Sequence, residues 1–361
     1  MSVENWATTR EIRQQPAIWA AWSDEFGADL PDLRDWMASL AADEIWLCGA
    51  GTSAYIGDLI AAHLGADPRR IRAVSTTDFV SVPQNFVRPG LRPLVVSFGR
   101  SGNSAETIGT LDILDHLMPE APRLNITCNG ESALATRRPV SGDQRTIILP
   151  DACHDAGFAM TSSFTTMLLT ALWVLDDAIT AEDLRGLSET AALMMDGLFQ
   201  MSADMVQPDR VVFTGSGALT FAAREAALKV MELAAGDIPA IWDSNLGFRH
   251  GPKSFVTPKT RIFQFLSGDA YTRKYDDDLT AELKTQFGPE FVITIGAGDA
   301  DIAFPALKND ALAGVLCVLV AQILAVTWSD KMGLNVDNPF QGKGTLTRVV
   351  SGVKLYLPEV L

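Results

Sequence analysis

A short apolar run that ends in Gly-x-Gly occurs twice in the sequence, and this repeat limits the possible fold more than any other feature. Glu44–Cys48 (EIWLC) leads into GAGTS at 49–53, and Val211–Thr214 (VVFT) leads into GSG at 215–217. Each run has the length and composition of a buried strand, and a helix-favouring segment follows each glycine loop. Strands that alternate with helices predict an α/β fold with parallel sheets.

A second strand-and-loop unit follows each of these two. Leu94–Phe98 runs into Gly99–Ser104, and Arg261–Leu266 runs into Ser267–Asp269, so the two pairs of units lie about 166 residues apart. A repeat of this kind indicates an internal duplication. Further strands are expected at 71–74, 124–127 and 146–149, and helices at about 54–64, 162–176 and 220–235.

The duplication predicts two tandem domains, each a parallel sheet between layers of helices in a three-layer αβα arrangement. The chain has 361 residues, which is enough for two domains with separate cores. We expect a helical arm over residues 1–30, a first domain over 31–195 and a second over 205–361. A mostly helical, loosely polar connector is expected near 181–208.

The charge balance limits the partners. The 29 basic and 44 acidic side chains give a net charge of −15, which argues against broad binding to nucleic acid or to an anionic membrane. A phosphate ester must therefore be bound locally, by backbone N–H groups and hydroxyls. The apolar run 311–326 is too short for a comfortable membrane span and contains Gln322, so we expect a buried helix there.

The cysteines and the N-terminal sequence favour a cytosolic protein. Cys48, Cys128, Cys153 and Cys317 are scattered without the paired spacing of metal ligands, as expected for reduced thiols in the cytosol. MSVENWATTREIRQQP has an acid and amides where a secretion signal needs a basic and then an apolar stretch. We expect no metal ion and no other cofactor.

The loops 49–53 and 99–104 are candidate phosphate sites, because they follow parallel strands and precede helix N-termini. Both combine glycines with hydroxyls, and Arg100 adds a charge to the second. Two other interpretations stay open. The pattern from Gly49 to Ala54 matches a short dinucleotide fingerprint, but the acid expected about 20 residues later is missing. The glycines could also do no more than close tight turns.

Three charged residues lie on one stripe of an otherwise largely apolar helix. Glu225, Lys229 and Glu232 are spaced i, i+4, i+7 within FAAREAALKVMELAA at 221–235. The stripe must face solvent, a partner or a cleft, because the rest of the helix surface, apart from Arg224, is apolar. An exposed surface ion pair and a polar catalytic cleft are both compatible with this pattern.

Histidine provides a further candidate group. The segment 242–252 (WDSNLGFRHGP) is expected to be a loop, and His250 lies in it between Arg249 and a Gly-Pro pair. His63 and His116 fall on expected helices, where surface or core roles are more common, and His154 remains a second candidate. These side chains do not have the clustered spacing of a metal site.

Together these motifs resemble the sugar isomerase (SIS) domain family over nearly the whole chain. The resemblance is carried by GAGTS, SFGRSGNSAET, GFAMTSS, AAREAALKVMELAAG and GFRHGPKS. REIRQQP, GFRHGPKS and YTRKYDDDL are similar to the branch of tagatose-6-phosphate ketose/aldose isomerases, also described as galactosamine-6-phosphate deaminases. The isomerase half of glucosamine-6-phosphate synthase is a more distant relative.

The resemblance implies roles at matching positions. Glu232 matches the base that moves a proton between C1 and C2, Lys229 lies on the same catalytic helix, and His250 matches a ring-opening histidine contributed across a dimer interface. The implied substrate-binding residues are Gly51, Thr52, Ser53, Arg100, Ser101, Ser104, Thr161, Ser162 and Glu225.

The sequence also departs from the family pattern. Gly99 and Arg100 replace a Ser-Gln pair, and the GFAMTS segment lacks a lysine that the synthase has nearby. The catalytic lysine of the synthase tail has no secure counterpart; Lys343 and Lys354 are the candidates.

The resemblance implies a homodimer with shared active sites that converts galactosamine 6-phosphate to tagatose 6-phosphate and ammonia. We expect no glutaminase domain before the arm, and therefore no amino-sugar synthesis from glutamine. Three alternatives stay open: a simple aldose–ketose isomerase, a glucosamine-6-phosphate deaminase, and a sugar-phosphate-binding regulator without turnover. An NAD-dependent dehydrogenase ranks below these.

Overall fold

The structure is a computed structural model that describes residues 3–343 and 353–359. The chain divides into two compact units. The first-sheet unit comprises Ile18–Asp155, Ser162–Ala181 and the described residues after 346. The second-sheet unit comprises the described residues up to Ala17, Ala156–Thr161 and the described residues between 182 and 346. The boundaries 1–30, 31–195 and 205–361 stay predictions, and residues 1–2, 344–352 and 360–361 of them lie outside the described residues.

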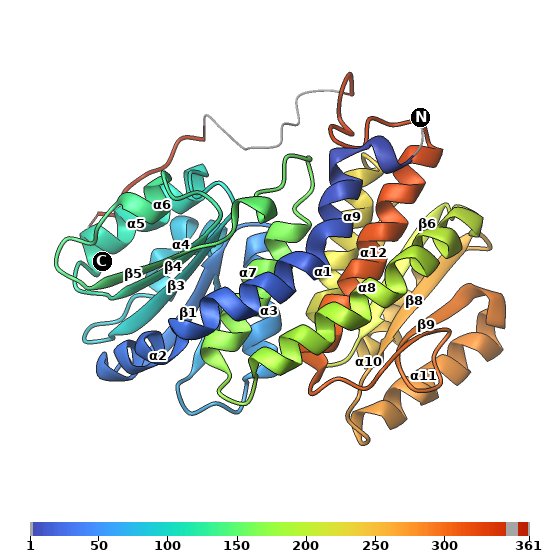
Figure 1. The fold of residues 1–361 in the computed structure, drawn as a ribbon, viewed down its shortest axis with the longest axis horizontal. Coiled ribbons are helices and arrows are strands. Elements are labelled where there is room, and N and C mark those ends of the chain that lie inside the picture. Colours follow the sequence, from blue (N-terminus) through green and yellow to red (C-terminus); the bar gives the residue numbers. More distant parts are fainter. Residues whose placement is uncertain (1–2, 344–352, 360–361) are drawn as a thin grey trace. The chain divides into compact units, whose positions relative to one another are not determined.

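The first sheet has five parallel strands in the order β2-β1-β3-β4-β5. Its strands are β1 (Glu44–Gly49), β2 (Ile71–Ser75), β3 (Pro93–Gly99), β4 (Arg123–Thr127) and β5 (Gln144–Ile148). Helices pack against it in two groups (Figure 1). One group is α3 (Thr52–His63) and α7 (Ser162–Leu175), and the other is α4 (Thr76–Ser81), α5 (Ala105–Leu117) and α6 (Ala133–Thr136).

The second sheet repeats this arrangement. Its order β10-β9-β8-β6-β7 is the same sequence of strands read from the opposite edge, and the pairing is again parallel. Its strands are β6 (Arg210–Gly215), β7 (Ala240–Ser244), β8 (Thr260–Leu266), β9 (Val292–Ala297) and β10 (Ile302–Phe304). Its helices are α9 (Ala218–Leu233), α12 (Asp310–Lys331), α10 (Asn245–Phe248) and α11 (Thr272–Phe287). The predicted three-layer α/β fold is confirmed.

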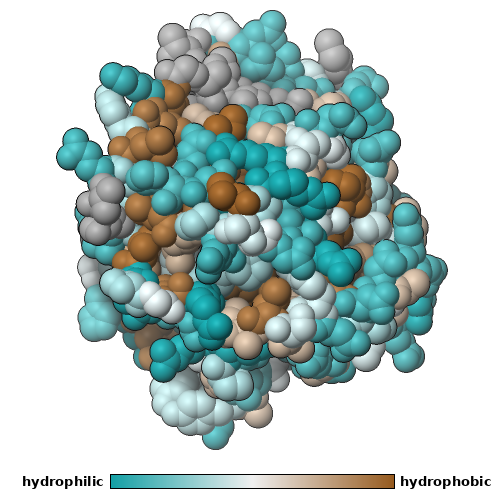
Figure 2. Space-filling model, turned by 90° about the vertical axis from the view of Figure 1, so that its left-hand side faces the viewer, coloured by the Kyte–Doolittle hydropathy of each residue, from teal (hydrophilic) through white to brown (hydrophobic). Residues whose placement is uncertain are grey.

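The remaining elements are helical. They are α1 (Ala7–Glu25), α2 (Leu30–Ser39), α8 (Ala181–Asp204) and 3₁₀ turns at Val3–Asn5, Phe26–Ala28, Pro83–Asn85, Asp151–Cys153, Gly251–Phe255 and Pro289–Phe291. The predicted helical connector is confirmed, since α8 covers most of residues 181–208. The side of the molecule seen in Figure 2 is mostly hydrophilic, with apolar side chains in separate patches.

Apolar composition explains where the core lies. All residues of β1, β3 and β4 are buried, as expected for central parallel strands covered on both faces. Helix α12 is apolar and long enough to cross a membrane, yet its most apolar 18-residue stretch is wholly buried inside the protein. The expected buried helix over 311–326 is therefore confirmed.

The repeated Gly-x-Gly has one physical explanation in both units. Gly51 and Gly217 precede α3 and α9 with φ values of 54° and 57°, a conformation that favours glycine. A Cβ on Gly49 would lie 2.5 Å from the Ser53 backbone, and one on Gly215 would lie 2.6 Å from the Leu219 backbone. The tight turn and the close strand–helix approach therefore require these glycines.

Two local predictions were wrong. Helix α3 begins at Thr52 rather than at about 54, because the turn at Gly51 already directs the chain into the helix. The segment 242–252 is not a plain loop: its first residues complete the edge strand β7, which pairs with β6. The Ser244 hydroxyl then caps α10 by accepting from the Gly247 N–H at 3.1 Å.

Candidate active site

The first glycine loop ends at a helix N-terminus that carries two hydroxyls. Thr52 and Ser53 form the first turn of α3, and both are 5% exposed. The first N–H groups of a helix have no partner within the helix, and the dipole makes this end favourable for anions. The turn at Gly51 therefore places the positive end of the α3 dipole and two hydroxyls at the carboxyl end of β1, while the Ser53 and Ala54 N–H groups donate within the turn to Ala50 O and Gly51 O at 3.1 and 2.9 Å.

The second loop lies on the neighbouring strand, since β1 pairs directly with β3. Arg100 is buried, and Ser101 is half-buried. The Ser104 hydroxyl accepts from the Thr107 N–H at 3.2 Å and therefore caps α5. Carboxyl ends of adjacent parallel strands share one sheet edge, so the two loops form a single edge rich in donors. We call residues 49–53 and 99–104 the first-sheet cradle.

The structure places Ser162, a predicted substrate-binding residue, at the start of α7 beside Asp155. Both its N–H and its hydroxyl donate to Asp155 Oδ1, at 3.0 and 2.5 Å, and Ser163 donates in the same way to Oδ2. Both serines are fully buried at the start of α7. Asp155 thus caps α7, and the donors of Ser162 are already engaged. Thr161, which precedes it, is also fully buried.

The charged stripe of α9 forms a chain of ion pairs. The Lys229 ammonium lies 2.6 Å from Glu232 Oε2 and 3.3 Å from Glu225 Oε1. The side chains of Lys229 and Glu225 are 0% exposed, whereas 25% of the Glu232 side chain is exposed. The alternative of an exposed surface ion pair is therefore wrong. Glu232 is the accessible end of a buried charge network.

Burial and charge act in opposite directions on Lys229. Burial lowers the pKa of its ammonium, but the charges of Glu225 and Glu232 raise it by more, so the pKa lies above its ordinary value. The group is a stable cation beside the Glu232 carboxylate. A fixed positive charge at this position can hold a carboxylate in one orientation and can stabilise negative charge that develops nearby.

His250 is exposed at the end of α10, where its backbone N–H donates to Gly247 O at 3.1 Å. Within residues 3–343 and 353–359 its imidazole makes no hydrogen bond to Glu232. The structure therefore does not bring these two predicted catalytic groups into direct contact. The other histidines lie elsewhere; His63, for example, pairs with Asp176 at 2.8 Å at the end of α3.

Both tail lysines have neighbours of their own. Lys343 forms an ion pair with Asp237, and the Lys354 ammonium lies 4.8 Å from the centre of the Tyr356 ring. Among the described residues, no group of three or more His, Cys, Asp or Glu side chains could hold a metal ion.

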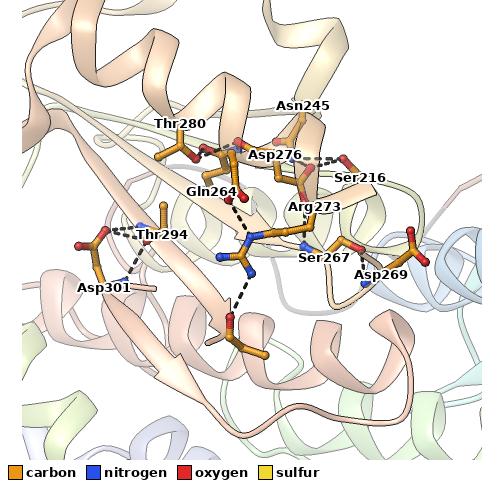
Figure 3. Close-up of polar contacts among 12 residues, drawn as sticks. Ser216, Asn245, Gln264, Ser267, Asp269, Arg273, Asp276, Thr280, Thr294 and Asp301 are labelled. Carbon is orange, nitrogen blue, oxygen red and sulfur yellow. Dashed lines mark hydrogen bonds and ion pairs between the residues drawn. The ribbon is translucent and has the colours of Figure 1, made fainter. Parts of the chain in front are cut away.

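A buried acidic residue at the carboxyl edge of the second sheet was missed by the sequence prediction. Asp276 of α11 is 0% exposed, and its carboxylate is surrounded by donors from three other segments (Figure 3). YTRKYDDDL looks like an exposed charged run, and the two acids after Asp276 are indeed exposed. The available signal was helical spacing, which places Asp276 on the same face as Leu279 and Leu283.

The whole chain is similar to proteins of known activity. It is 38% identical over 358 residues to the D-galactosamine-6-phosphate deaminase AgaS of Shewanella sp. (strain ANA-3), a match that covers 97% of this chain and 91% of that protein. The chain belongs to the AgaS family. The AgaS deaminase of Escherichia coli O157:H7 is also 38% identical, over 97% of this chain and 95% of its own length. No protein-family model matches the chain.

Solved structures place the AgaS family chain among phosphosugar enzymes. The tagatose-6-phosphate ketose/aldose isomerase from Escherichia coli has a TM-score of 0.88 at 35% identity, covering 99% of this chain and 98% of that one. A glucosamine-6-phosphate deaminase from Thermotoga maritima, at 22% identity and a TM-score of 0.76, supports the fold alone. The predicted resemblance to sugar isomerases, and to the galactosamine branch in particular, is confirmed.

Proposed function

We propose that this protein is a D-galactosamine-6-phosphate deaminase that yields tagatose 6-phosphate and ammonia. The AgaS relatives, similar over nearly the whole chain, support the substrate. The observation that carries the chemistry is the position of Glu232, a partly exposed carboxylate at the end of a buried ion-pair chain. Enolisation needs one base that removes a proton and returns it to the neighbouring carbon, and a carboxylate held by a fixed cation suits this task.

The reaction follows from these groups. His250 assists opening of the sugar ring, which frees the C1 aldehyde. Glu232 removes the C2 proton to give an enolamine and returns a proton to C1, which leaves a ketose imine at C2. Water adds to this imine, the C–N bond breaks, and ammonia leaves with tagatose 6-phosphate. Lys229 orients Glu232 and stabilises negative charge that develops on oxygen.

We propose that the first-sheet cradle holds the phosphate. Its backbone N–H groups, the hydroxyls of Thr52, Ser53 and Ser101, and the Arg100 guanidinium supply donors in a protein whose net charge is −15. Such local donors at a helix N-terminus suit a phosphate ester. Ser104 contributes mainly by capping α5, and Thr161 and Ser162 mainly by shaping the buried start of α7. Glu225 neutralises Lys229 from the buried side.

An ammonia-release assay tests the proposal. Wild type, Glu232→Gln and the exposed control Glu189→Gln are incubated with galactosamine 6-phosphate. We expect rapid release by wild type and control, and a decrease of at least about 100-fold for Glu232→Gln, as for loss of a general base. Undiminished release by Glu232→Gln would exclude Glu232 as the base.

The same assay over several sugar phosphates separates the alternatives. If ammonia release has a higher kcat/KM with glucosamine 6-phosphate than with galactosamine 6-phosphate, the protein is a glucosamine-6-phosphate deaminase. Conversion of an aldose 6-phosphate to its ketose without ammonia release from amino sugars would assign a simple isomerase, the activity named for the Escherichia coli structural relative. Binding of these ligands with no turnover would assign a regulator.

We propose a homodimer with shared active sites. Three apolar side chains, Met231 of α9, Trp242 of the edge strand β7 and Leu246 of α10, are 38%, 37% and 43% exposed. The Arg224 guanidinium lies 5.3 Å from the centre of the Trp242 ring, which extends this surface. Exposed apolar and aromatic side chains on neighbouring elements are typical of interface cores.

Two measurements test the dimer. Analytical ultracentrifugation should give twice the monomer mass for wild type and less for Trp242→Glu. If the sites are shared, a mixture of Glu232→Gln and His250→Ala subunits, unfolded and refolded together, should recover about a quarter of wild-type activity, because one site of each mixed dimer contains both native groups. Absence of any recovery, despite mixed dimers, would assign both residues to the same subunit. We also propose a cytosolic location, which the four free, buried cysteines support.

A further inference from the structure

The two sheets carry equivalent loops between their third strand and the following helix. In the first sheet Cys48 pairs with Ser97, and in the second Thr214 pairs with Gln264. Cys48 and Thr214 hold the same position in their sheets, so Ser97 of β3 corresponds to Gln264 of β8. Five residues separate this strand from the next helix in each unit, namely 100–104 and 267–271. Ser267 and Gly268 therefore occupy the places of Arg100 and Ser101 in the first-sheet cradle.

In the second sheet this place is filled by the chain itself. Asp276 Oδ1 accepts from the Ser216 hydroxyl at 2.7 Å and from the Asn245 amide, and Oδ2 accepts from the Ser267 N–H at 2.8 Å (Figure 3). Ser216 belongs to the glycine loop after β6, and Asn245 begins α10. All three partners donate, which is the arrangement that an ionised carboxylate accepts.

A second carboxylate accepts a hydrogen bond from the next backbone N–H of the same loop. Asp310, at the start of α12, accepts from the Gly268 N–H at 2.8 Å and also from the Ser267 hydroxyl. The two backbone N–H groups that would meet a phosphate in this loop are thus both bound to internal carboxylates. Burial raises the pKa of Asp276, while hydrogen bonds from Ser216, Ser267 and Asn245 favour its ionised form.

The corresponding loop of the first sheet differs from this arrangement. Within the part of the chain that the structure describes, the backbone N–H group of Ser101, which corresponds to that of Gly268, donates to no acceptor. Asp276 is the fifth residue of α11, and the fifth residue of α5 is Gly109. The position that supplies an anion in one unit therefore has no side chain at all in the other.

We propose that Asp276 is a built-in anion that closes the second-sheet copy of the phosphate cradle, so that each chain binds one sugar phosphate, at the first sheet. The proposal rests on the proposed function only for the first-sheet site. Closure of the second site is argued from the contacts of Asp276 and of its neighbour Asp310. The second-sheet unit, which carries α9, then does not compete for the substrate phosphate.

Isothermal titration with inorganic phosphate and with galactosamine 6-phosphate tests the closure. Wild type should bind one equivalent per chain. Asp276→Ala, which removes the central carboxylate but keeps a helix-favouring residue, frees the Ser216, Asn245 and Ser267 donors and should bind a second equivalent of inorganic phosphate, more weakly because Asp310 still accepts from the Gly268 N–H. A folded Asp276→Ala protein that still binds one equivalent would overturn the proposal.

A reciprocal variant covers the case in which Asp276→Ala does not fold. Gly109→Asp places a carboxylate at the equivalent position of the first sheet and should weaken phosphate binding at least tenfold, whereas Gly109→Asn, of the same size but uncharged, should weaken it less. Equal effects of the two variants would overturn the proposal. Failure of the proposed function is seen separately, as wild type that binds no phosphate while Asp276→Ala binds one equivalent.

Discussion

Lys229 donates a 2.6 Å hydrogen bond to Glu232, and the two ends of this pair differ in exposure: the lysine is fully buried and a quarter of the glutamate side chain is accessible. The buried end is balanced by Glu225 at 3.3 Å. A buried ammonium between two carboxylates is costly to form and costly to disrupt, because each charge has lost its hydration. The pair therefore links the stability of α9 to the proposed base.

Lys229→Met should be strongly destabilising. Loss of the ammonium leaves Glu225 as a buried carboxylate without its cation, and breaking a buried pair from one side costs about 3–5 kcal/mol. Urea unfolding at pH 7 measures the change. The double variant Lys229→Met/Glu225→Gln should recover a large part of the loss, because the uncompensated charge is then removed as well. A double variant no more stable than the single one would contradict this account.

Glu44 gives a pH-dependent prediction. Burial raises the pKa of its carboxyl, but hydrogen bonds from Trp46 and Arg72 and the charge of Arg72 lower it by more, so the folded pKa lies below the ordinary value. The stabilisation is therefore fully present above the unfolded pKa of about 4.3 and is lost as the pH falls through the folded pKa. Glu44→Gln should reduce stability at pH 7, and its difference from wild type should shrink below pH of about 4.

Urea unfolding of wild type and Glu44→Gln between pH 7 and pH 3 measures this difference. Glu120→Gln is a suitable control, since Glu120 is exposed. Its stability should follow that of wild type throughout. A Glu44→Gln difference that stays constant with pH would mean that the carboxylate charge does not contribute.

Ser104 separates a structural role from a binding role. Its hydroxyl caps α5, so Ser104→Ala should cost about 1 kcal/mol of stability. Asn309→Ala removes the cap of α12, whose side chain accepts from Leu312 N–H at 3.0 Å, and should cost about as much. If Ser104 also contacts the phosphate, only its variant should raise KM, with kcat little changed. If the two variants have the same KM and kcat, Ser104 only caps α5 and does not contact the phosphate.

Local sequence patterns predicted the repeated turns and the stripe of α9, because each depends on residues close together in the chain. Gly49 and Gly51 show their role through the turn that they must form, and Lys229 through its helical spacing. The surroundings of Asp276 and Ser162 could not be predicted in this way. Asp276 meets Ser216, 60 positions earlier, and this contact exists only once the second sheet has formed.

The matched glycines Gly51 and Gly217 provide the most direct test of the first-sheet cradle. Both hold positive φ with ψ of −130° and −126°, and a Cβ would meet no atom within 4 Å at either position. Gly51→Ala and Gly217→Ala should therefore cost similar stability, about 1–3 kcal/mol, from backbone strain alone. Thermal or urea unfolding of the two variants measures this cost.

Their kinetics should differ even though their stabilities agree. Gly51 shapes the turn whose N–H groups we propose to bind the phosphate, so a distorted turn should raise KM for galactosamine 6-phosphate by about tenfold, equivalent to one charge-assisted hydrogen bond of roughly 1.4 kcal/mol. Gly217 shapes the corresponding turn of the second sheet, where Asp276 already occupies the donors. Its variant should leave KM near the wild-type value. Equal KM values in the two variants would place the phosphate away from the turn at Gly51.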